Sequence, residues 1–77
     1  MSGKVNIVGQ IAEVKRELAL RRSVYPSLIR GGKMREAEAD LCTARMEAVL
    51  ATLMFCQSHE ADIRDYIAMK REREGLV

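Results

Sequence analysis

The residues best able to do chemistry in this sequence are Cys56 and His59, which lie three positions apart. On a continuous helix this spacing puts both side chains on one face, where a histidine can activate a cysteine as a nucleophile. The sequence offers no third residue to orient the histidine and no glycine-rich turn for an oxyanion site. A cysteine packed in a core beside a polar histidine is the simpler interpretation. We therefore predict that the protein is not an enzyme and has no catalytic residue.

Metal and cofactor sites are not predicted either. His59 is the single histidine, and the sequence has no Cys-x-x-Cys pattern. Carboxylate pairs such as Glu36 and Asp40 share a helix face, but without a histidine on a facing helix they are typical of solvated surface. The run Gly31–Lys33 lacks the preceding strand, the first glycine and the following Ser or Thr of a phosphate-binding loop. We expect no metal and no cofactor.

The strongest candidate for a binding site is the basic stretch from Arg16 to Arg35. It holds six basic residues and one acid, a net charge of +5 in a chain whose overall charge is +2. Basic side chains of this density can bind phosphates, and an aromatic ring among them can stack on a base. The candidate contact residues for a partner protein or nucleic acid are Arg21, Arg22, Tyr25, Arg30, Lys33 and Arg35.

Several interpretations of this basic stretch stay open. Nucleic-acid-binding domains usually have isoelectric points above about 9 and more basic residues than this chain carries. Arg21 or Arg22 could instead pair with downstream acids such as Glu36 or Glu38. Binding of an acidic protein and simple solvation are further possibilities. We favour an unidentified protein partner and keep nucleic acid as the alternative.

These residues must be positioned by helices, because the apolar residues repeat at helical spacing. In the first half of the chain they fall, four, three and four residues apart, at Ile7, Ile11, Val14 and Leu18. This is the stripe of a helix that packs against another helix. The next position is Arg21, where a charge interrupts the stripe and can reach water or pair across an interface. We predict a first helix over about residues 5–30.

An elbow is expected between two helices of similar length. The adjacent glycines Gly31 and Gly32 can supply the left-handed conformation that ends a helix. Pro26 removes a helix donor, so it should kink or interrupt the first helix. A second helix is predicted over about residues 35–57, and its cap position carries Arg35 where Ser or Thr would be usual.

The second helix is apolar over a broad face. The apolar residues on it include Leu41, Cys42, Met46, Val49, Leu50, Leu53, Met54 and Cys56. This face is wider than one helix–helix seam needs, which indicates contact with two neighbours. We favour a break near Ser58, which could cap a shorter third helix over about residues 59–73, although nothing in the sequence forbids a straight helix there.

The predicted fold is all-α: one domain, residues 1–77, with an antiparallel helical hairpin, a Pro/Gly elbow and a shorter C-terminal helix. A lone core in a chain of 77 residues rarely supplies more than about 3–5 kcal/mol. A disulfide is not expected, because Cys42 and Cys56 would lie about 21 Å apart on one helix. We therefore expect a homodimer that forms a helical bundle. Its candidate core is Ile7, Ile11, Val14, Leu18, Leu41, Val49, Leu53 and Phe55.

A cytoplasmic location is expected. Both cysteines are predicted to be free and no signal peptide is evident, which favours a reducing compartment. The longest uncharged run, Ala48–Ser58, is much shorter than a membrane span. We expect no membrane association.

The sequence also resembles a family of small phage and prophage proteins. The residues that carry the likeness are Arg16–Pro26, Gly32–Met34, Glu36–Asp40 and Arg45–Leu50. They match a pattern of the form REL..R..VYP, GK[ML], EAD and MEA[VI]L, which covers about half of the chain, and Val24-Tyr25-Pro26 is its most distinctive element. The family has no known function and provides no catalytic residue. The resemblance implies a phage-derived cytoplasmic accessory protein that binds a host or phage protein; many members carry Thr or Ser where this chain has Arg35.

Overall fold

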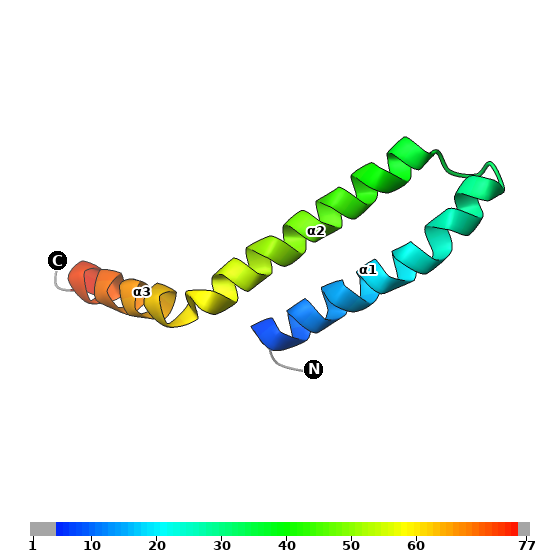
Figure 1. Cartoon of the computed structure of the whole chain (residues 1–77). Helices are drawn as coiled ribbons and strands as arrows, with labels where there is room; N and C mark the ends of the chain where they lie inside the picture. Colours follow the sequence, from blue (N-terminus) through cyan, green and yellow to red (C-terminus); the bar gives the residue numbers. More distant parts are fainter. Residues whose placement is uncertain (1–4, 76–77) are drawn as a thin grey trace.

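The computed structural model describes residues 5–75 of the 77-residue chain. In this part of the chain there are three helices: α1 (Ile7–Arg30), α2 (Glu36–Ser58) and α3 (Glu60–Gly75). Figure 1 shows α1 and α2 side by side as an antiparallel hairpin, with α3 continuing past the open end of that hairpin. The prediction of an all-α fold is confirmed.

The helix α1 begins two residues later than the apolar pattern indicated, because Asn6 caps it. The Asn6 side chain accepts a hydrogen bond from the backbone N–H of Gly9 at 2.8 Å. The side-chain amide of Gln10 donates to the carbonyl of Val5 at 2.9 Å. Asparagine is among the best N-cap residues, since its side chain satisfies a donor that the first helical turn leaves free.

The core of the hairpin is a thin seam between α1 and α2. The buried apolar side chains in the described residues are Ile11, Leu18 and Ala39. Half-buried apolar side chains continue the seam at Ile7, Val14, Leu28, Met46, Leu50 and Leu53. Two helices alone cannot enclose a side chain on all sides, so most seam residues keep one edge in solvent.

The elbow ends α1 with a Schellman motif. The backbone N–H of Lys33 donates to the carbonyl of Leu28 at 3.0 Å, and that of Gly32 donates to the carbonyl of Ile29 at 3.1 Å. Gly32 has a φ of +72°, whereas Gly31 stays right-handed at −79°. These two hydrogen bonds satisfy carbonyls at the end of the helix. Of the two glycines, only Gly32 uses the left-handed region.

Pro26 lies inside α1 and does not interrupt it. The helix continues for four residues beyond the proline, to Arg30. Proline has no N–H to donate, so the carbonyl of Arg22, four residues earlier, loses its usual helical partner. The helix survives because the elbow motif and the seam with α2 hold its last turns.

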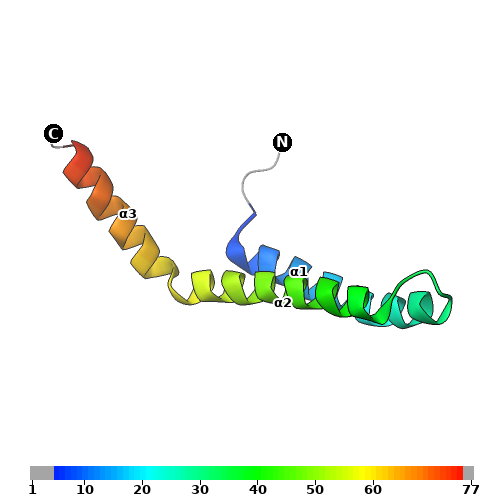
Figure 2. The ribbon, with the colours of Figure 1, turned by 90° about the horizontal axis from the view of Figure 1, so that it is seen from above.

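The break between α2 and α3 is a single residue, His59, with φ −111° and ψ 15°. Helical hydrogen bonds still span this residue. The backbone N–H of His59 donates to the carbonyl of Phe55 at 3.1 Å, and the backbone N–H of Ile63 donates to the carbonyl of His59 at 2.9 Å. The predicted break near Ser58 therefore lies one residue later, and Ser58 ends α2. Figure 2 shows that α3 leaves the direction of the hairpin at this point.

The molecule is elongated. Its principal extents are 62 × 28 × 21 Å and its radius of gyration is 18.6 Å, whereas a compact chain of this length would have a radius of about 11 Å. Beyond Glu60, every described residue of α3 is exposed. None of the helices in residues 5–75 is long and apolar enough to cross a membrane.

Candidate functional site

A groove of about 450 Å³ lies between α1 and α2 near the elbow. One wall comes from the last turns of α1 and holds Arg21, Arg22 and Arg30, and the other comes from the first turns of α2 and holds Glu36 and Asp40. Apolar and small side chains complete the lining: Tyr25, Pro26, Ile29, Ala39 and Thr43. The groove therefore combines a basic wall, an acidic wall and an apolar lining.

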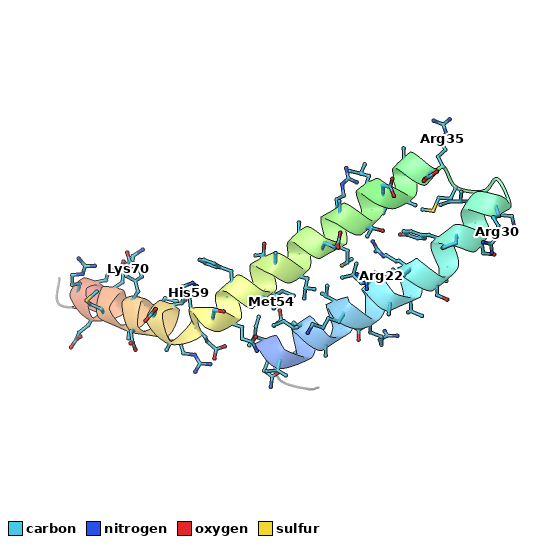
Figure 3. The ribbon with its side chains drawn as sticks, viewed as in Figure 1. Arg22, Arg30, Arg35, Met54, His59 and Lys70 are labelled. Atoms are coloured by element: carbon cyan, nitrogen blue, oxygen red, sulfur yellow. The ribbon has the colours of Figure 1, made fainter. Side chains whose placement is uncertain are left out.

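The structure brings together four of the six predicted contact residues, namely Arg21, Arg22, Tyr25 and Arg30. Lys33 lies exposed in the elbow and Arg35 is the N-cap residue of α2, so neither lines the groove. Figure 3 shows Arg22 and Arg30 on α1 and Arg35 at the start of α2.

The sequence interpretation did not place Glu36 and Asp40 in this site. The sequence pattern favoured solvated surface for this pair. Both residues lie in the first turns of α2, where acidic side chains favour the positive end of the helix dipole. An antiparallel hairpin with a short elbow sets those first turns opposite the last turns of α1. The glycine pair marks this elbow in the sequence, so its position could have predicted that Glu36 and Asp40 lie opposite the end of α1.

The side chain of Arg21 connects α1 to α2. Its Nε donates to Glu17 Oε1 at 3.0 Å, and its Nη1 donates to the backbone carbonyl of Cys42 on α2 at 3.0 Å. The hydrogen bond that Arg21 donates to Glu17 raises the pKa of Arg21, so the side chain stays charged. The acids proposed from sequence as its partners, Glu36 and Glu38, are not those that it binds.

Arg22 and Arg30 are exposed and free for a ligand. In the described residues, no ion pair joins either arginine to Glu36 or Asp40 across the groove. Opposite charges therefore face the same groove without neutralising one another.

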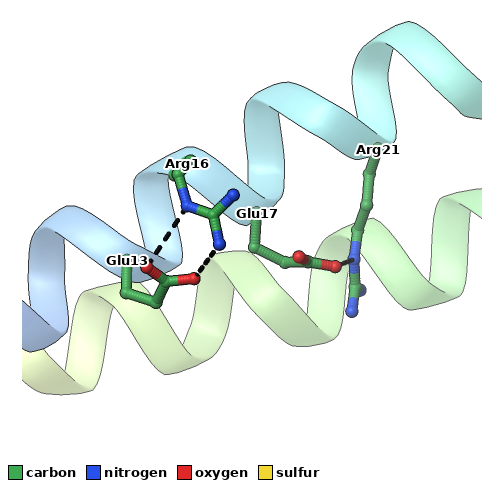
Figure 4. A network of polar contacts seen from close by, with 4 residues as sticks. All are labelled: Glu13, Arg16, Glu17 and Arg21. Atoms are coloured by element: carbon green, nitrogen blue, oxygen red, sulfur yellow. Dashed lines mark hydrogen bonds and ion pairs between the residues drawn. The ribbon is translucent and has the colours of Figure 1, made fainter.

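Two successive ion pairs lie along α1 next to this region (Figure 4). Arg16 pairs with Glu13, and this contact lowers the pKa of the Glu13 carboxyl. One turn further on, Arg21 pairs with Glu17. The Glu13–Arg16 pair is well exposed, and exposed pairs contribute little to stability.

The predicted dimer core divides into two groups. Five of its members are buried or half-buried along α1 and α2: Ile7, Ile11, Val14, Leu18 and Leu53. The other three are exposed on α2: Leu41, Val49 and Phe55. The α1 stripe finds its partner in α2 of the same chain, so only the exposed group is available to a second copy.

Cys56 and His59 do not form a nucleophile pair in the described residues, since no hydrogen bond joins them. The His59 ring instead lies against Phe55, with ring centroids 4.5 Å apart, and its Nδ1 is 3.9 Å from Asp62. Cys42 and Cys56 are both free thiols. Residues 5–75 contain no group of three or more His, Cys, Asp or Glu side chains that could hold a metal ion.

Comparison with protein-family models, with curated protein sequences and with solved structures gave no match.

Proposed function

We propose that this protein is a non-enzymatic interaction module that binds another protein through the groove beside the elbow. One observation carries the proposal: the groove has a basic and an acidic wall that are not paired with each other, around an apolar lining. Charged side chains that face one groove without pairing with each other favour a partner with the complementary pattern.

The partner expected at this groove is a protein segment of mixed charge. Its carboxylates would pair with Arg22 and Arg30, and its basic side chains would pair with Glu36 and Asp40. Guanidinium–carboxylate contacts are directional, which gives such a pairing its specificity. An apolar side chain of the partner would rest on Tyr25 between the two walls.

Nucleic-acid binding remains the alternative, supported by the cluster of exposed basic residues at this end of the hairpin. Arg22, Arg30, Lys33 and Arg35 are all exposed there. Against it, Glu36 and Asp40 line the groove and would repel phosphates that approached the arginines.

The resemblance to phage and prophage proteins supports a role as a cytoplasmic accessory protein. We include homodimer formation in the proposal, because three members of the predicted dimer core are exposed on α2. Leu41 follows Asp40 of the elbow groove, whereas Val49 and Phe55 lie further along α2. A dimer contact through Val49 and Phe55 is therefore compatible with binding at the groove.

Fluorescence anisotropy with two labelled probes of equal length tests the elbow site. One probe is a helical peptide with Glu, Lys and Leu along one face, and the other is a single-stranded oligonucleotide. We expect the peptide to bind more tightly, and we expect the double variant Arg22→Ala/Arg30→Ala to weaken its binding at least about tenfold. Arg73→Ala, on exposed α3, is the matched control and should leave binding unchanged.

Salt dependence separates the two candidate functions. Oligonucleotide binding that exceeds peptide binding, and that falls steeply between about 50 and 200 mM salt, would favour the nucleic-acid alternative. Peptide affinity that is the same for the wild type and the double variant would contradict the proposed site.

A further inference from the structure

The second half of α2 is apolar around most of its circumference but is covered on one side only. No charged residue occurs from Ala48 to Ser58. Leu50 and Leu53 face the seam with α1 and are half-buried. The large side chains pointing in other directions remain exposed: Val49 at 45%, Met54 at 46% and Phe55 at 62%. A helix segment that is apolar all round is normally buried, so this segment lacks a covering element.

The helix α3 carries an apolar stripe that also lacks a cover. Ile63, Tyr66 and Ile67 share one face at helical spacing, and all three are exposed. The helix has 16 residues, a length at which an isolated helix is only marginally stable in water. Its stability therefore requires packing that its own hairpin does not provide.

These two surfaces do not meet within one chain. Helical hydrogen bonds span His59 and hold the junction, where α3 bends away from the direction of the hairpin (Figure 2). A turn that folded α3 back onto α2 would have to break them. The cover for each surface must come from another molecule.

The exposed area is sufficient for a stable dimer. The accessible surface is 6471 Å², whereas a compact protein of 8.7 kDa would expose about 4,700 Å². The excess of about 1,700 Å² exceeds the roughly 800 Å² per partner that a standard interface buries.

We propose that the covering molecule is a second copy of this chain, with α3 of each copy packed antiparallel on the uncharged half of α2 of the other. A two-fold axis then passes near His59. It makes the two α3–α2 contacts identical, so the assembly stops at two copies. Ile63 of one copy lies near Phe55 of the other, and Tyr66 lies over the small residues around Ala51.

The charges at the ends of the two helices agree with the antiparallel direction. In this arrangement the last turns of α3, with Lys70 and Arg71, lie beside Glu47 of the other copy, which directly precedes the uncharged segment. Arg45 of that copy lies near Glu72 or Glu74. The uncharged segment itself presents no charge that would repel α3, and complementary charges at its edge fix the direction of approach.

This dimer interface lies at the end of the molecule opposite the elbow (Figure 1). The inference deepens the homodimer part of the proposed function and does not rest on the elbow groove, so the two sites can fail independently.

The first measurement is solution mass by light scattering over a wide range of protein concentration. The wild type should have twice the mass of one chain. Ile63→Glu/Ile67→Glu, which adds charge to the apolar stripe of α3, should be a monomer that retains the helical circular dichroism of the hairpin. Ala61→Glu/Ala68→Glu adds the same charge on the opposite face of α3 and should stay dimeric. A monomeric wild type, or a dimeric stripe variant, would overturn the proposal.

A mixing experiment tests which helices meet. Phe55→Glu should also be monomeric, because it disrupts the α2 side of the contact. In a mixture of Phe55→Glu with Ile63→Glu/Ile67→Glu, one of the two identical contacts brings together intact surfaces, so dimers of mixed composition should reappear. Pairing of α3 with α3 would leave Phe55→Glu dimeric by itself, and pairing of α2 with α2 would leave Ile63→Glu/Ile67→Glu dimeric by itself. Either result, or a mixture that stays monomeric, would rule out the reciprocal arrangement.

Discussion

The guanidinium of Arg21 on α1 donates a 3.0 Å hydrogen bond from Nη1 to the backbone carbonyl of Cys42 on α2. Arg21 stands where the apolar stripe of α1 would have its next member, and its side chain is only 23% exposed. Glu17 balances its charge from one turn earlier. Because the Arg21 side chain reaches one particular carbonyl of the facing helix, this contact helps to fix the register of α1 relative to α2.

Arg21→Ala should lower the melting temperature, since it removes both the hydrogen bond between the helices and the packing of the arginine stem. The expected decrease is about 4–8 °C, the usual effect of losing one net hydrogen bond in a domain of this size. Circular-dichroism melts measure it. Arg22→Ala removes a neighbouring exposed arginine that forms no ion pair in the described residues, and its melt should match the wild type. Equal melts for both variants would mean that the Cys42 contact contributes nothing.

The two elbow glycines should respond differently to alanine. Gly32 has a φ of +72°, where a Cβ is strained, so Gly32→Ala should destabilise the protein by about 1–2 kcal/mol. Gly31 is right-handed, and an added Cβ would meet the Ser27 carbonyl only at an ordinary 3.4 Å. Gly31→Ala should therefore be neutral or stabilising by up to about 1 kcal/mol. Urea unfolding gives both values, and an opposite order would contradict the Schellman assignment.

Arg35→Ser should stabilise α2. Arg35 is the N-cap residue and makes no side-chain capping hydrogen bond, whereas a serine hydroxyl can accept from a free N–H of the first turn. The expected gain is about 0.5–1 kcal/mol in urea unfolding. Arg35→Ala removes the same charge without adding a cap, so it separates capping from electrostatics. A serine variant no more stable than the alanine variant would show that the cap position is already satisfied by water.

The opposite change at α1 is Asn6→Ala, which deletes a cap that the structure contains. It should cost about 1 kcal/mol, and it should reduce helical signal at the start of α1. Asn6→Ser keeps an acceptor at the same position and should recover most of the loss. If alanine and serine behave alike, the hydrogen bond to Gly9 has no net effect on stability.

Acidification should remove a small part of the stability through Glu13. Arg16 lowers the pKa of this carboxyl from its ordinary value of 4.5. A group with a lowered pKa in the folded state stabilises above its unfolded pKa, and this contribution disappears as the pH falls through the folded value. Melting temperatures measured from pH 6 downward should therefore fall less steeply for Glu13→Gln than for the wild type. A Glu13→Gln curve as steep as that of the wild type would contradict this prediction.

Some of this architecture could be predicted from local sequence. The spacing of Ile7, Ile11, Val14 and Leu18 identified the face of α1 that packs on another helix, because a helix turns by a fixed angle per residue. The paired glycines marked the elbow for an equally local reason, since only glycine enters the left-handed region without strain. These features depend on residues within one or two turns of each other.

The remaining features depended on which surfaces meet in space. Periodicity shows that a helix face is apolar, but it does not show which element covers that face. It therefore could not predict that the α1 stripe packs on α2 of the same chain, or that Phe55 is exposed. The Cys42 carbonyl as partner of Arg21, and the opposed charges of Arg30 and Glu36 in one groove, arise only when the hairpin closes. Sequence alone determined the helical character of the chain and the place of the turn, and it left open whether the chain breaks near Ser58. The tertiary structure decided which surfaces pack together, because the apolar face of a helix can be buried against any neighbouring apolar surface that the fold places beside it.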